Sequence, residues 1–179
     1  MSTRLLTAGL LAGLGMYVWG MFSHMALPLG DLGIQTLPDE ASIATLLKDK
    51  IKEPGLYYFP FEKDMAKAEI LLKERPRGLL TFTPHTVPFS MGFNLGVQLV
   101  NDLLLGLLLA WLLSKVTLPG LGEKLAFGVV LAVLATLSYL MPYWNWYGFP
   151  LTFVLAGACD ALMATLIGTI IVTKWMRWV

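Results

Sequence analysis

Residues 89–113 have the sequence FSMGFNLGVQLVNDLLLGLLLAWLL, a nearly unbroken apolar run that contains one acid and no basic residue. A helix needs about 20 apolar residues to cross the hydrocarbon core of a bilayer. Three further stretches of the chain meet this requirement, at residues 5–27, 121–141 and 150–173. The sequence therefore predicts an all-α membrane protein with four transmembrane helices.

The composition of the whole chain agrees with this class. Of the 179 residues, 56% are hydrophobic and 14% are charged, whereas soluble domains carry roughly 25% charged residues. The formal net charge of +1 provides no field that would attract nucleic acid, so no nucleic-acid partner is expected. The one cysteine, Cys159, excludes an intramolecular disulfide framework and a zinc site built from several thiolates.

The first apolar stretch has two interpretations. Arg4 followed by an apolar run is typical of a signal peptide. The run from Leu5 to Leu27 is long for the apolar part of such a peptide, however, and no cleavage motif of small residues follows it. We therefore expect this stretch to be kept as the first span.

Basic residues predict the orientation of the spans, because Lys and Arg concentrate in short cytoplasmic connections. Lys115 and Lys124 flank the second connection, whereas the third connection, at residues 141–149, has no charge. Long loops cross the membrane largely regardless of their charge. We expect both termini in the cytoplasm and residues 29–88 outside.

The segment at residues 29–88 has the pattern of a small α+β extracytoplasmic domain. Pro38-Asp39-Glu40 is typical of the first turn of a helix, and Pro54-Gly55 marks its end. Residues 55–61 then predict a strand, residues 64–74 a second helix and residues 78–83 a second strand. Because an isolated two-stranded sheet is only marginally stable, we expect this domain to pack against the helix bundle or against a partner.

The chain thus divides into a first transmembrane helix at 1–28, the extracytoplasmic domain at 29–88 and a three-helix transmembrane region at 89–179. Polar residues interrupt the apolar pattern inside the last of these parts. In the second span they occupy one helix face: Asn94, Gln98, Asn101 and Asp102. Asp160 lies at a similar depth in the fourth span, among small residues that allow close helix packing. No Lys or Arg occurs at that depth, so we expect at least one of the two acids to be protonated at neutral pH.

These five polar residues are the candidate binding or interface site, and they have two interpretations. They can hold helices or subunits together through hydrogen bonds inside the membrane. Alternatively, they can bind a proton, a cation or a polar ligand, which is a common role of acids within membrane spans. Their spacing does not decide between the two.

The two histidines, His24 and His85, are weaker candidates for holding a metal or an axial cofactor. Neither has a second ligand at metal-binding spacing, and a hydrogen-bonded histidine at the membrane interface is the expected role. The sequence shows no nucleophile with a base and no set of metal ligands, so we expect no metal, no cofactor and no catalytic residue.

Four short motifs near the start of the chain resemble those of a group of small bacterial four-span membrane proteins with an extracytoplasmic segment after the first span. They are Val18-Trp19-Gly20, Ala26-Leu27-Pro28, Leu37-Pro38-Asp39-Glu40 and Pro54-Gly55-Leu56-Tyr57. The resemblance implies a location in the bacterial inner membrane and carries no activity. Where members of that group have Trp-His after the proline, this chain has Leu29-Gly30, so no histidine site follows from the resemblance there.

Together these features predict a non-enzymatic integral membrane protein, an accessory or structural subunit of a membrane assembly. Its expected partners are membrane lipids and either other integral membrane subunits or further copies of itself. The alternative is a small oligomeric channel or ion-linked binding protein that uses the intramembrane carboxyl groups.

Overall fold

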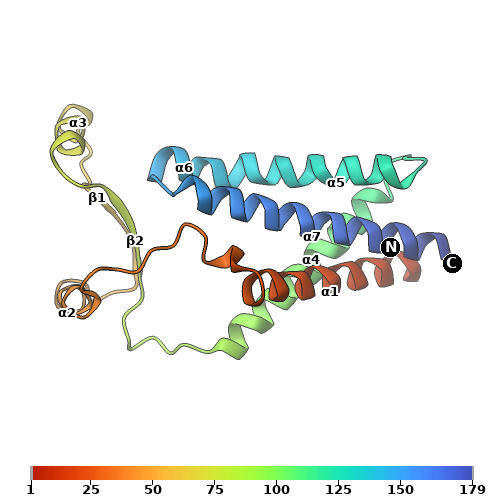
Figure 1. Ribbon diagram of the computed structural model, residues 1–179, viewed down its shortest axis with the longest axis horizontal. Coiled ribbons are helices and arrows are strands. Elements are labelled where there is room, and N and C mark those ends of the chain that lie inside the picture. The colour runs from red at the N-terminus through yellow and green to blue at the C-terminus, as the bar shows by residue number, and fades with distance from the viewer. Residues whose placement is uncertain (1, 179) are drawn as a thin grey trace. The chain divides into compact units, whose positions relative to one another are not determined.

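The computed structural model describes residues 2–178 of the chain (Figure 1). Its contacts divide these residues into two units. The helical unit comprises residues 2–34, 90–145 and 149–178, and the α+β unit comprises residues 35–89 with 146–148. The elements follow one another in the order α1 (Thr3–Met25), η1 (Pro28–Gly30), α2 (Glu40–Lys50), β1 (Gly55–Phe59), α3 (Met65–Glu74), β2 (Gly78–Phe82), α4 (Met91–Leu113), α5 (Leu121–Ala135), η2 (Thr136–Leu140), α6 (Met141–Tyr147) and α7 (Leu151–Trp178).

Four helices of the helical unit are long and apolar enough to cross a membrane: α1, α4, the continuous helix at Leu121–Tyr147, and α7. Their mean hydropathy lies between 1.6 and 2.0. The four predicted spans are therefore confirmed as helices of membrane-spanning length and composition. Helix α7 packs against both α1 and α5, and α4 crosses α1 (Figure 1).

Glycines set the crossing of α1 and α4. A Cβ atom added to Gly9 would lie 2.8 Å from the Cα of Leu107, and one added to Gly13 would lie 2.5 Å from the Cα of Leu103. A Cβ added to Gly106 would overlap backbone atoms of Gly9 and Gly13. The two helices therefore meet backbone to backbone, which is the packing that small residues allow in a membrane.

The core of the helical unit surrounds this crossing. Its buried residues come from three helices: Leu5, Ala8, Ala12, Met16, Leu109, Ala110, Leu113 and Val172. Seven of these residues lie toward the N-terminal end of α1 or the C-terminal ends of α4 and α7, and Met16 lies near the middle of α1.

The third span differs from expectation at its end. The sequence placed the end of the helix before Pro142, but the helix continues to Tyr147. Residues Thr136–Leu140 form a π-helical turn, in which the Met141 N–H donates to the Thr136 carbonyl five residues earlier. This wider turn accommodates the proline ring, which would otherwise clash with the preceding turn of an α-helix.

The α+β unit has the expected order of helix, strand, helix, strand. Its two strands pair antiparallel, with Gly55 opposite Phe82 and Phe59 opposite Gly78. Asp64 is the N-cap of helix α3, and its carboxylate accepts hydrogen bonds from the N–H groups of Ala66 at 3.0 Å and Lys67 at 3.3 Å. The sequence pattern thus predicted these local structures well, because caps and turn residues determine them.

No residue of this unit between 35 and 89 is buried. Large apolar side chains remain open to the surroundings, such as Leu56 at 65%, Phe61 at 72% and Met65 at 82% exposure. The two strands are the only pair of elements in the unit with extensive mutual contacts. The α+β unit therefore lacks a hydrophobic core of its own.

Candidate functional site

The polar face of α4 separates into a buried end and an exposed end. Asp102 is only 7% exposed, and its Oδ1 accepts a hydrogen bond from the Gln98 side-chain amide at 3.0 Å. Gln98 itself is exposed, as are Asn94 and Asn101. The sequence placed these residues on one face, and the structure shows that only Asp102 enters the bundle.

The crossing of α1 and α4 explains why Asp102 is buried. The position of a Cβ added to Gly13 lies against the backbone of Asp102 and Leu103, so α1 covers this turn of α4. Toward the start of α4 this cover ends, because a Cβ added to Gly92 or Gly96 would have no neighbour within 4 Å. Every residue from Met91 to Gln98 is exposed.

A cavity of about 330 Å³ lies beside Asp102, between α4, α5 and α7. Its other lining residues are apolar except Thr165, whose hydroxyl donates to the Ala161 carbonyl at 2.7 Å. Small side chains on α5 and α7 leave this space open: Ala132, Ala135, Ala161 and Ala164. Asp102 is thus the one ionisable group among the described residues that line the cavity.

Asp160 lies on α7 directly before Ala161 and is half-buried. Its Oδ1 is buried and has no hydrogen-bond partner among the described residues. The carboxyl groups of Asp102 and Asp160 are close enough to interact electrostatically. The structure therefore brings together the two acids that the sequence singled out.

Neither acid is neutralised by a basic side chain. The ion pair found among residues 2–178 joins Lys73 and Glu69, in the α+β unit. In apolar surroundings a carboxyl group needs a hydrogen-bond donor, a counter-ion or a proton of its own. The Asp102–Asp160 region can accordingly hold helices together or receive a donor from outside the chain.

The two histidines belong to different units. The His24 ring Nδ1 lies 3.0 Å from both the Ser23 hydroxyl and the Gly20 carbonyl, at the end of α1. His85 follows β2 in the α+β unit. Within the described part of the chain, no group of three or more His, Cys, Asp and Glu side chains could hold a metal ion.

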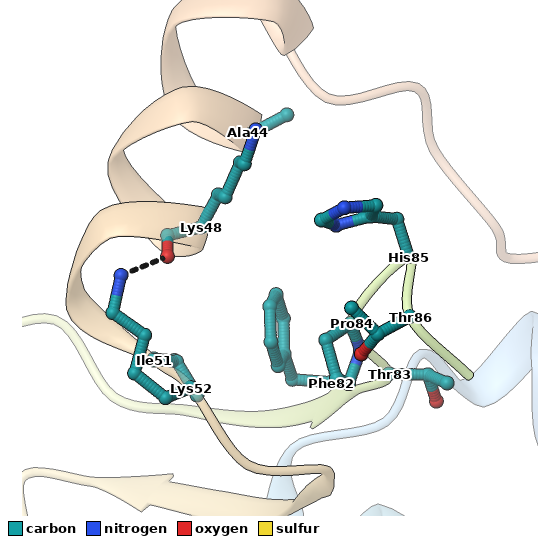
Figure 2. Close-up of a pocket in the computed structure, with 9 residues that line it drawn as sticks. All are labelled: Ala44, Lys48, Ile51, Lys52, Phe82, Thr83, Pro84, His85 and Thr86. Carbon is teal, nitrogen blue, oxygen red and sulfur yellow. Dashed lines mark hydrogen bonds between the residues drawn. The ribbon is translucent and has the colours of Figure 1, made fainter.

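The structure also reveals a cluster that sequence reasoning missed. His85 lines a pocket of the α+β unit together with Lys48 of α2 and Lys52, which follows that helix (Figure 2). The available signal was the pair of lysines four residues apart, Lys48 near the end of α2 and Lys52 just after it. Nothing in the sequence linked them to His85.

No protein-family model, curated protein or solved structure matches the chain.

Proposed function

We propose that this chain is a non-enzymatic subunit of a protein assembly in the bacterial inner membrane. In this proposal both termini face the cytoplasm and the α+β unit lies outside. The observation that carries the proposal is the exposure of three amide side chains, Asn94, Gln98 and Asn101, on a helix of membrane-spanning length.

The Gln98 amide donates to Asp102 and Asn101 also interacts with that carboxyl group, whereas no side-chain hydrogen bond of Asn94 is found among the described residues. Amide N–H and C=O groups that face lipid without a partner are unfavourable in hydrocarbon. A neighbouring helix can supply partners, and each such hydrogen bond contributes roughly 0.6 to 2 kcal/mol. The outer half of α4 also exposes apolar side chains around a shallow hollow formed by Phe93, Gly96, Val97 and Val100. The hollow and the amides lie on adjacent faces of α4, and partner helices placed there would cover them.

The α+β unit supports the same proposal independently. It has no buried residue between 35 and 89 and exposes large apolar side chains. Exposed apolar surface of this kind is typical of regions that bind another protein or a membrane. A subunit that contacts its partners through both regions accounts for the two observations together.

The test is purification of the tagged full chain from its native source in mild detergent, followed by intact-mass measurement of the eluted proteins. Stoichiometric co-purification of unrelated membrane subunits is the expected result. Asn94→Leu combined with Asn101→Leu should remove these subunits, because leucine cannot replace the amide hydrogen bonds.

Ser138→Leu is the matched control, since Ser138 is an exposed polar residue of the third span. It should leave co-purification unchanged. If the wild-type chain elutes alone, or if the control loses the partners equally, the proposal is wrong.

A second candidate function is ion or ligand binding by Asp102 and Asp160. The unpartnered Oδ1 of Asp160 and the cavity beside Asp102 favour it. Four apolar helices leave little room for a pore, so a channel of this kind requires oligomers. Elution of a homo-oligomer without other subunits would favour this candidate over the first.

A further inference from the structure

The α+β unit contains a pocket of about 480 Å³ between α2 and the segment that follows β2. Part of its lining is apolar and comes from Ile51, Phe82 and Pro84. The rest is polar or basic and comes from Lys48, Lys52, His85 and two threonines. The pocket is therefore amphipathic, with an apolar side and a cationic side.

The two lysines give this pocket its charge. Lys48 lies in the last turn of α2, and Lys52 lies two residues after the end of that helix at Lys50. Among the described residues neither forms an ion pair and no acid lines the pocket. The Lys52 ammonium donates to the Lys48 carbonyl at 2.9 Å, and its other N–H groups remain available for a ligand.

His85 faces the lysines from the other side. Figure 2 shows its imidazole ring pointing toward α2 across the pocket. The sequence suggested His85 as a weak metal ligand, but the positive charges of the two lysines that line the same pocket would repel a metal cation. The same groups attract an anion, to which imidazole and ammonium N–H groups can donate hydrogen bonds.

We propose that this pocket binds a phosphate group attached to an apolar ring or chain. The phosphate would lie between Lys48, Lys52 and His85, and the apolar part would pack on Ile51 and Phe82. Lipid headgroups and soluble organic phosphates share this chemistry, so the test must separate the two sources.

The test uses nuclear magnetic resonance of the full chain in dodecyl maltoside micelles, with ring-labelled histidine. The chain has only two histidines. His24 belongs to the helical unit and is the internal reference. Adding phenyl phosphate should shift the His85 signals saturably and leave the His24 signals in place. Inorganic phosphate should bind more weakly because it lacks the apolar part, and benzylamine should not bind.

Charge-neutralising variants locate the site. Lys48→Gln and Lys52→Gln should each raise the Kd for phenyl phosphate about three- to fivefold, the effect of losing one partly exposed charge contact. Lys50→Gln is the matched control, because Lys50 lies on the same helix and does not line the pocket. It should change the Kd less than about twofold.

Mixed micelles then separate the two sources. Displacement of phenyl phosphate by dioleoylphosphatidylglycerol, and not by dioleoylphosphatidylcholine, would identify an anionic lipid headgroup as the ligand. Binding of phenyl phosphate that neither lipid displaces would identify a soluble organic phosphate. Three results would overturn the proposal: equal movement of the His24 signals, equal weakening by Lys50→Gln, or binding of benzylamine as tight as that of phenyl phosphate.

Discussion

At the scale of single residues, Asp102 is buried and its Oδ1 accepts a hydrogen bond from the Gln98 amide. Such a bond typically contributes about 1 kcal/mol to stability, and more when one partner is charged. What Asp102 contributes therefore depends on the acceptor oxygen that it offers to Gln98.

This leads to a prediction for Asp102→Asn and Asp102→Ala. Asparagine keeps an acceptor oxygen for Gln98, so the unfolding free energy should change by about 1 kcal/mol or less. Alanine removes the acceptor and enlarges the neighbouring cavity, so it should cost about 1 to 3 kcal/mol. Unfolding by dodecyl sulfate in mixed micelles, followed by circular dichroism, measures both; equal losses would contradict the role of the hydrogen bond.

The sequence identified Asp102 and Asp160 because acids are rare inside membrane spans. It did not predict that Asn94 and Asn101 stay outside the bundle, since helical periodicity says which residues share a face but not where a second helix crosses it. The basic cluster of the α+β unit was missed for a similar reason. Lys48 and His85 line the same pocket only because the segment after β2 returns beside α2.

At the scale of elements, the crossing of α1 and α4 requires glycine at one position of α4 and tolerates a larger residue at another. Gly106→Ala should destabilise the protein by about 1 to 3 kcal/mol, the usual cost of overpacking, because its Cβ would overlap the backbone of α1. Gly96→Ala is the matched control in the same helix and should have little effect, because the added Cβ has no neighbour within 4 Å. The same dodecyl sulfate titration distinguishes them, and similar losses would mean that the crossing is not where we describe it.

Helix α3 depends on local interactions because no residue of it is buried. Asp64→Ala removes the acceptor for two N–H groups at its start and should cost about 1 kcal/mol. Amide hydrogen exchange in residues 66–71 should then become about fivefold faster. Asp49→Ala, an exposed acid of α2 that caps no helix, should leave this rate unchanged; acceleration by both variants would argue against the cap.

The third span shows where element prediction from sequence reached its limit. Proline normally ends a helix, and the pattern placed the end there. A π-helical turn contains one residue more than a turn of α-helix, and no characteristic amino-acid composition marks it. Pro142 alone could therefore not reveal it. Helix existence was predictable, and the continuation through Pro142 was not.

At the scale of the whole molecule, the proposed orientation has a direct test. In a Cys159→Ala background, Ser42→Cys in α2 should react with a membrane-impermeant maleimide added to intact cells from which the outer membrane has been removed. Ser114→Cys, at the end of α4, should react only after the cells are lysed. Both serines are exposed in the structure, so the side of the membrane on which each one lies determines whether the maleimide reaches it. The reverse pattern would invert the proposed topology.

The missing core of the α+β unit has a consequence for how the amount of this protein is controlled. A unit without buried residues draws little stability from its own packing, so its folded population follows the concentration of whatever binds it. Copies without a partner would spend more time unfolded and be degraded first. The cellular level of the chain would then follow the level of its partner without any dedicated regulator.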